Sequence, residues 1–278
     1  MTAELTEREA QRLEQAFDAE RALNRQVLRE VRTPAELGAL AMFVAARTDP
    51  RVDALGVQLK VACARGCSWC CRGLRVEVTP PEAIALAEYI RLRTAPEQLP
   101  RLLEGLREAA AEARSKSSLQ LWDERRPCYF LDTESGACTV YEARPLGCRS
   151  VMSLDASACE AAHRGQGVAL PRPMAVDALY GVARMALHAA CEDAGLDMRG
   201  FELTNALEAA FHTPHAAERW HAGERVFDAA VTPELAGNAA PRDLAFERSQ
   251  LVPAAQLLRR TRPKTANEKK RERRSRRG

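Results

Sequence analysis

The stretch CARGCSWCC, residues 63–71, places four cysteines within nine positions. Thiolates gathered this closely repel one another, and a bound metal cation is the usual compensation. The two-residue gap between Cys67 and Cys70 lets both sulfurs face one metal, as in zinc sites and iron–sulfur clusters. Cys71 follows directly, so we expect it to reach that same ion less easily and to bind a second metal or remain a reactive thiol. The stretch therefore predicts a fold organised around a cysteine-ligated centre.

Eight of the nine cysteines lie between residues 63 and 159, and the last of these is Cys159. Cys191 stands instead in an apolar helical pattern, which predicts a core position. No histidine occurs among the clustered cysteines until His163, and an all-thiolate donor set suits both iron–sulfur clusters and zinc. One structural zinc needs only four thiolates, which favours an iron–sulfur cluster, although two zinc ions account for the cysteines equally well.

Two further segments complete a recognisable pattern: Cys128-Tyr-Phe-Leu, and CTVYEARPLGCR at residues 138–149. With CARGCSWCC they resemble the CxxCxxCC or YkgJ-like cysteine-cluster family, a zinc- or iron-chelating domain. Tyr129 stands where the family usually has proline, and the first cysteine gap is three residues rather than two. The resemblance implies metal ligation by Cys63, Cys67, Cys70, Cys71, Cys128, Cys138 and Cys148, with Tyr141, Arg144, Pro145 and Arg149 matching the rest of the second motif.

The resemblance also defines an enzymatic alternative. One relative, the flagellin lysine methylase, is an iron–sulfur enzyme that uses S-adenosylmethionine, so a similar protein-modifying activity is the second hypothesis. Cys63, Cys67 and Cys70 match the triad spacing of radical S-adenosylmethionine enzymes, but those enzymes need a barrel of alternating strands and helices, for which strand signals are too few. A redox sensor acting through Cys70 and Cys71 is the third hypothesis. The sequence is thus compatible with an enzyme and with a metal-binding protein that has no catalytic activity.

Helix signals dominate the rest of the chain. Thr33-Pro34-Ala35-Glu36 combines a hydroxyl cap, proline at the first helical position and glutamate at the third, which predicts a helix through about Ala46. Thr79-Pro80-Pro81-Glu82 predicts another helix start. Further helices are expected over residues 5–32, 97–114 and 174–194, and strands at GVQLKV, LRVEV and a hairpin in which YFL and CTVY flank DTESGA. The predicted fold class is mainly α: an irregular helical domain with a small β-hairpin and loop region around the metal centre.

We divide the chain into N-terminal helices (1–60), the cysteine-cluster region (61–160), a C-terminal helical part of the same domain (161–258) and a basic tail (259–278). The tail holds eleven Lys and Arg residues against Glu268 and Glu272, and we expect it to be disordered. Such an arm binds a protein or nucleic-acid partner through salt-sensitive contacts, or serves only as a solvated tail.

Two features of the sequence indicate where the protein is located. The N-terminus lacks a charged start followed by an apolar stretch, so it does not resemble a signal peptide. The longest apolar run, residues 37–46, is about half of what a bilayer requires. We therefore expect a cytoplasmic protein without membrane contact, whose nine cysteines serve metal binding or redox chemistry rather than disulfides.

Overall fold

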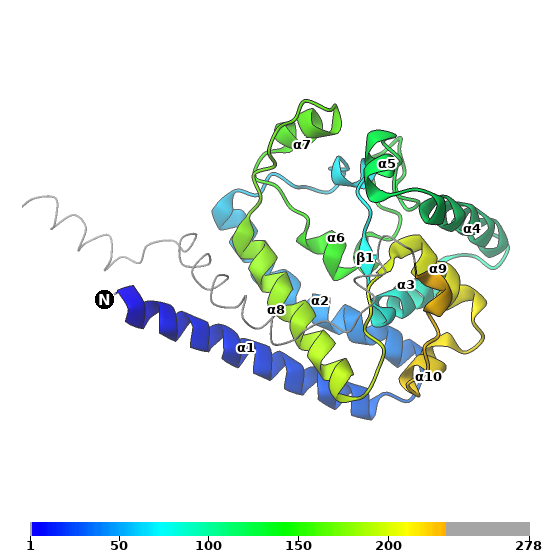
Figure 1. Ribbon diagram of the computed structural model, residues 1–278, viewed down its shortest axis with the longest axis horizontal. Coiled ribbons are helices and arrows are strands. Elements are labelled where there is room, and N and C mark those ends of the chain that lie inside the picture. The colour runs from blue at the N-terminus through cyan, green and yellow to red at the C-terminus, as the bar shows by residue number, and fades with distance from the viewer. Residues whose placement is uncertain (1, 232–278) are drawn as a thin grey trace, which may run out of the picture.

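The computed structural model describes residues 2–231, so the predicted basic tail lies outside the described residues. The fold is mainly α, as predicted: the described part contains ten α-helices and one two-stranded sheet (Figure 1). None of the described helices has the length and apolar character needed to cross a bilayer.

Long helices form the body of the molecule. Helix α1 packs along α8, and α2 packs against both α3 and α8, while α9 lies against α3 and α4 (Figure 1). The bounds of the helices that build and flank this body are α1 Thr2–Glu30, α2 Pro34–Leu59, α3 Pro80–Arg93, α4 Leu99–Ser115, α8 Met174–Asp193, α9 Leu203–His212 and α10 Ala216–His221.

Both predicted helix starts are confirmed by their capping hydrogen bonds. The Thr33 hydroxyl accepts from the Glu36 backbone N–H, and the Glu36 carboxylate accepts from the Thr33 N–H at 3.0 Å. The predicted end of α2 near Ala46 is wrong, because the helix continues through Pro50 to Leu59. Val52, only 1% exposed, remains in the core beyond the proline. The burial of residues such as Val52 therefore compensates for the backbone hydrogen bond that Pro50 cannot donate.

The β structure differs from the prediction. Of LRVEV, only β1 (Glu77–Val78) is a strand, and it pairs antiparallel with β2 (Phe201–Glu202), distant in sequence. GVQLKV is not a strand, since most of it belongs to the end of α2. The predicted hairpin shrinks to one bridge between Leu131 and Cys138 around a turn. The second arm of the hairpin is short because the 3₁₀ turn Tyr141–Ala143 begins directly after Val140.

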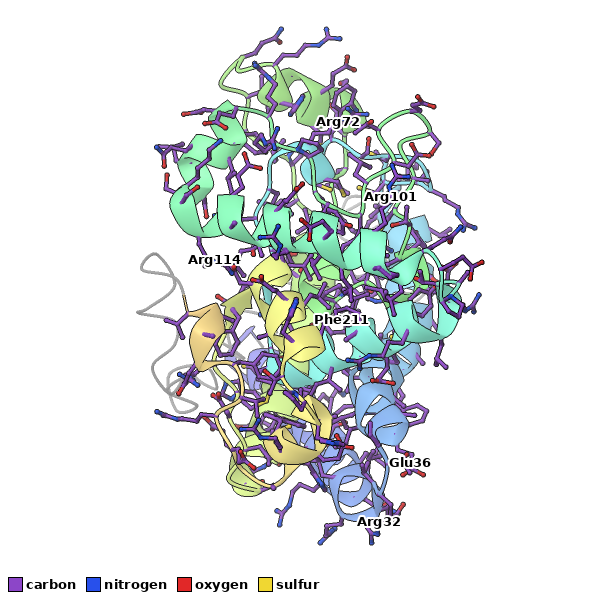
Figure 2. All side chains as sticks on the ribbon, turned by 90° about the vertical axis from the view of Figure 1, so that its right-hand side faces the viewer. Arg32, Glu36, Arg72, Arg101, Arg114 and Phe211 are labelled. Carbon is purple, nitrogen blue, oxygen red and sulfur yellow. The ribbon has the colours of Figure 1, made fainter. Side chains whose placement is uncertain are left out.

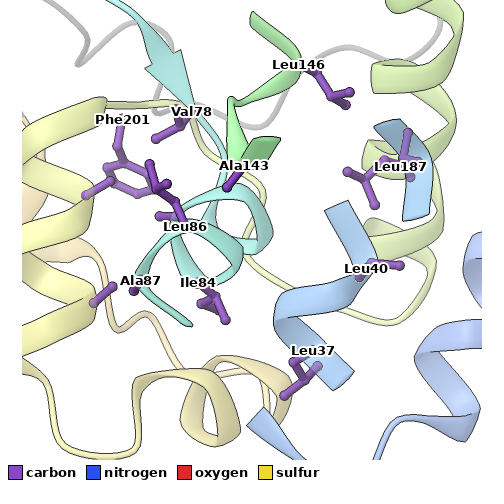
Figure 3. Close-up of a cluster of buried hydrophobic side chains, with 14 of the residues drawn as sticks. Leu37, Leu40, Val78, Ile84, Leu86, Ala87, Ala143, Leu146, Leu187 and Phe201 are labelled. Carbon is purple, nitrogen blue, oxygen red and sulfur yellow. The ribbon is translucent and has the colours of Figure 1, made fainter. Parts of the chain in front are cut away.

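The main core joins the body to the cysteine region. Figure 3 shows Leu40 of α2, Leu86 of α3 and Leu187 of α8 in one buried cluster, each at most 2% exposed. Leu146, 1% exposed, belongs to the same cluster and is the first residue of α6 (Leu146–Ser150). Because Cys148 lies on that short helix, the core positions one of the predicted ligands.

The cysteine region consists of short elements and loops. Besides α6, it contains α5 (Ser118–Asp123), α7 (Ala156–His163) and the 3₁₀ turn η1 (Cys70–Arg72). Figure 1 shows α5 and α7 at the end of the molecule away from α1, and Figure 2 shows Arg72 at this end, with Arg32 and Glu36 at the opposite one. The cysteine region therefore covers the end of the helical frame away from α1, and α6 reaches in toward α8.

Candidate metal centre

All seven cysteines expected to bind metal line one cavity of about 290 Å³. Four come from the loop at residues 63–71 and three from residues 128–148. The two segments are joined directly, because the backbone N–H of Cys128 donates to the Cys71 carbonyl oxygen at 2.7 Å. The fold thus brings together two groups of thiols that the sequence separates. These cavity-lining cysteines are Cys63, Cys67, Cys70, Cys71, Cys128, Cys138 and Cys148.

The distances between the sulfur atoms limit which metal ions the thiols can bind without moving. The Sγ atoms of Cys70 and Cys71 lie 3.9 Å apart, close to the sulfur–sulfur edge of about 3.8 Å in a zinc tetrahedron with Zn–S bonds of about 2.3 Å. Adjacency in sequence therefore does not keep Cys71 away from the ion that Cys70 binds. Among residues 2–231, however, no three His, Cys, Asp or Glu side chains are grouped so that they could hold a metal ion. The donor chemistry fits a metal, but binding requires more of the thiols to come as close together as Cys70 and Cys71.

Backbone N–H groups are aimed at several of these sulfurs. Cys63 Sγ accepts from the Ser153 N–H at 3.3 Å. The N–H of Phe130 bonds to the Cys128 thiol and that of Val140 to the Cys138 thiol, each two residues further along the chain, and both bonds lower the pKa of the thiol they reach. Hydrogen bonds of this kind stabilise the thiolate, which is the form that binds a metal.

Burial acts in the opposite direction. It raises the pKa of the Cys128 thiol to about 11, and it also raises the pKa values of Cys138 and Cys148. The pKa of Cys70 is raised first by its hydrogen bond with Cys71 and then by burial. Without a cation these sulfurs are therefore protonated at neutral pH. A bound metal reverses this preference by displacing the protons.

The arginines near the cysteines have different roles. The Arg144 guanidinium lies over the Tyr141 ring, 3.8 Å from its centroid, and its charge lowers the pKa values of Cys138 and Cys148. Arg149 is a buried structural residue, which donates to Asp49 Oδ2 at 2.5 Å and to the Arg144 carbonyl oxygen at 2.7 Å. Arg144 is thus placed to offset negative charge on the thiolates, whereas Arg149 holds the motif in shape.

Sequence reasoning missed several cavity-lining residues of the helical body, among them Asp49 of α2 and Tyr180 of α8. The Tyr180 hydroxyl donates to Asp49 Oδ1 at 2.7 Å, and Asp49 also receives the Arg149 bond. Burial, followed by the bond to Asp49, raises the Tyr180 pKa, so the phenol is neutral. No local motif marks either residue, because only the packing of α2 and α8 brings them to the cysteines.

Glu82 has two structural roles, and the sequence predicted only the first of them. Its Oε2 caps α3 by accepting from the Thr79 N–H and hydroxyl, as predicted. Its Oε1 accepts from the Leu146 N–H at 2.8 Å, although these residues lie far apart in sequence. This buried carboxylate therefore fixes the start of α6 and, through it, the position of Cys148.

The two remaining cysteines lie in different surroundings. Cys191 is completely buried in α8, which confirms its predicted core position. Cys159 lies on α7 and lines a second cavity, of about 110 Å³, that also touches Cys63, Cys67 and Cys70. His163, at the end of α7, packs against Trp69 and Trp122 with ring centroids 5.6 and 6.2 Å away.

Clustered thiols around a shared cavity on a helical frame define the class of cysteine-rich metal-chelating domains. Residues 62–164 match the model of the CxxCxxCC family, described as "Putative zinc- or iron-chelating domain". The match runs from the cysteine loop to the end of α7 and so covers the cysteine region but not the long helices on either side of it. Comparisons with curated proteins and with solved structures gave no match.

Proposed function

We propose that this protein binds metal in an all-cysteine centre within the cavity of about 290 Å³. The observation that carries the proposal is the convergence of seven thiols, from two separated segments, on that single cavity. The backbone N–H groups aimed at Cys63, Cys128 and Cys138 support it, because they favour the thiolate form. The ligands are the seven cysteines named for this cavity, with Arg144 compensating part of their charge.

The preferred cofactor is an iron–sulfur cluster, and zinc is the alternative. Seven thiols exceed the four that one zinc needs, and the cavity is far larger than a single ion. The close approach of Cys70 and Cys71 suits zinc equally well. A zinc ion supplies structural stabilisation, whereas a cluster adds the capacity to exchange electrons.

Anaerobic purification followed by an absorption spectrum and metal analysis tests the proposal. A cluster gives a coloured protein with iron and sulfide, whereas a colourless protein with zinc selects the alternative. Cys67→Ser and Cys148→Ser are expected to lose metal, while Cys191→Ser, in the core, keeps it. Full metal content in both of the first two variants would refute the ligand assignment.

An S-adenosylmethionine-dependent protein-modifying enzyme is the less well supported function. The polar wall formed by Asp49, Arg144 and Tyr180 gives the cavity groups that could bind a substrate. Its volume, about 290 Å³, is at the lower end of small-molecule pockets, before any metal centre is placed in it. Incubation of the reduced protein with S-adenosylmethionine, followed by a search for 5'-deoxyadenosine and S-adenosylhomocysteine, tests this function. Absence of both products removes it.

A further inference from the structure

The smaller cavity, of about 110 Å³, lies where α5, α7 and the cysteine loop at residues 63–71 meet. Its wall is largely apolar and includes Trp69 of the loop, Trp122 of α5 and Met152. An apolar cavity of roughly 150 Å³ binds a molecule as large as benzene. The smaller cavity therefore has the size and the surface to hold one aliphatic side chain.

Leucine side chains adjoin this cavity and remain exposed to solvent. Leu74 and Leu170 line it, and they are 40% and 43% exposed. Leu154, 39% exposed, follows Ser153, which also lines the cavity. The Leu154 N–H donates to the Pro171 carbonyl oxygen at 2.8 Å, which places Leu154 close to Leu170. Exposed apolar side chains grouped around an apolar cavity are typical of a surface that contacts another molecule.

Two positive charges flank the aromatic part of this surface. The Arg72 guanidinium lies 5.9 Å from the centroid of the Trp69 ring, and Arg125 Nε donates to the His163 carbonyl oxygen at 2.9 Å. Burial and then the charges of both arginines lower the pKa of His163, so both guanidiniums lie near its ring. Within residues 2–231, their hydrogen bonds go to hydroxyl and carbonyl oxygens, and neither arginine pairs with a carboxylate. A ligand that carries carboxylates can therefore neutralise them.

We infer that the smaller cavity, with its exposed leucines and the two arginines, is a docking site for an acidic protein segment that carries an aliphatic side chain. The aliphatic side chain fills the cavity and covers the leucines, and neighbouring carboxylates pair with Arg72 and Arg125. An apolar anchor in a pocket with charged contacts at its edge is the usual arrangement of a protein interface. The inference goes beyond the proposed function, because the docking contacts require neither a thiol nor a metal.

Titration of the full-length protein with the peptide acetyl-Asp-Leu-Asp-amide tests the inference. The chain has three tryptophans, so nuclear magnetic resonance of their indole N–H groups locates the bound peptide. The signals of Trp69 and Trp122 should shift, whereas that of Trp220, buried in the core, should not. Acetyl-Asp-Ala-Asp-amide should bind about tenfold more weakly because it lacks the apolar anchor. Acetyl-Asn-Leu-Asn-amide should bind about two- to fivefold more weakly because it lacks the carboxylates.

Two variants with matched controls test the leucines and the arginines separately. Leu170→Asp should weaken binding of acetyl-Asp-Leu-Asp-amide about tenfold, because a carboxylate then replaces an apolar contact, whereas Leu92→Asp, at another exposed leucine, should leave it unchanged. Arg125→Asn should weaken binding about two- to fivefold, and asparagine tolerates the left-handed backbone of this position, where φ is 53°. Arg101→Asn, on the exposed side of α4, is the control. Far-ultraviolet circular dichroism checks that each variant is folded.

The contrary outcomes are distinct from one another. Unchanged signals of Trp69 and Trp122 in the unmodified protein would overturn the docking site. Equal affinity for the acidic peptide and its asparagine counterpart would overturn the acidic partner. Self-association that Leu170→Asp abolishes in sedimentation experiments would assign the surface to a second copy of the chain instead, and binding to phosphatidylglycerol vesicles that the same variant abolishes would assign it to a lipid surface. Metal analysis of the same samples tests the proposed function independently, so either proposal can fail without the other.

Discussion

The helical body and the cysteine region are stabilised by different means. In the body, α2, α3, α8 and α9 contribute apolar side chains to a continuous core, and several of these are completely buried. In the cysteine region, short helices and loops surround cavities lined by thiols that burial keeps protonated. The comparison teaches that the body folds through hydrophobic burial, whereas under the proposed function the cysteine region depends on a cation that converts the thiols into ligands.

The two regions meet through a shared hydrophobic core and through specific polar contacts. Glu82 of α3 binds the start of α6, and Leu146 inserts into the core of the body. Asp49 of α2 connects Arg149 with Tyr180 of α8. A substitution at one of these contacts should therefore destabilise both regions, whereas a substitution within one region should affect mainly that region.

Removing the metal should have the largest effect. Chelation, or Cys148→Ser, removes binding energy on the order of 10 kcal/mol for a structural thiolate site, and this energy stabilises the cysteine region. Thermal unfolding followed by circular dichroism should show a much lower melting temperature for that region, with most helix of the body retained. An unchanged melting temperature after complete metal removal would contradict the comparison.

Ile90→Ala should destabilise the body without removing the metal. Ile90 is 2% exposed in the core, and truncation of such a residue costs about 2–5 kcal/mol. Urea denaturation measures the loss, and metal analysis should give the same stoichiometry as the unmodified protein. Leu92→Ala on the same helix is the control, since Leu92 is 77% exposed and its loss should cost little. Equal destabilisation by the two variants would argue against the assigned core.

Glu82→Gln should affect both regions moderately. An amide replaces a buried carboxylate that accepts three hydrogen bonds, from Thr79 and Leu146. A lost buried acceptor costs about 1–3 kcal/mol, and metal affinity should also fall because Cys148 is less well positioned. Denaturation and metal titration measure the two effects. Glu104→Gln, at an exposed ion pair, is the control. If Glu82→Gln leaves the metal affinity as unchanged as this control does, Glu82 does not position the site.

Asp193→Asn should have the smallest effect. Arg21 donates to Asp193 and holds the pKa of this carboxyl below its usual range, and the partly exposed pair contributes about 0.2–1 kcal/mol. Because the folded-state pKa is lowered, this contribution is present above the unfolded pKa of about 3.9 and disappears as the pH falls through the folded value. Denaturation at pH 7 and at pH 3 should show the two proteins converging in acid. A difference that persists or grows at low pH would exclude the ion pair as its source.

Local signals in the sequence determined the helical class, the starts of α2 and α3 and the set of clustered cysteines. Helices are predictable in this way because their hydrogen bonds and caps join residues only a few positions apart, as Thr33 and Glu36 do. The matching cysteine motif predicted the chelating domain for the same reason, since its ligand spacing is contained in short segments.

Tertiary structure alone decided how these parts are combined. It extended α2 beyond Pro50, paired β1 with a strand distant in the chain, and brought Asp49 and Tyr180 to the cavity. It also placed Cys159 at a smaller cavity that Cys63, Cys67 and Cys70 line as well. These features depend on contacts between residues far apart in sequence, which form only when buried side chains pack together, so no local pattern could specify them.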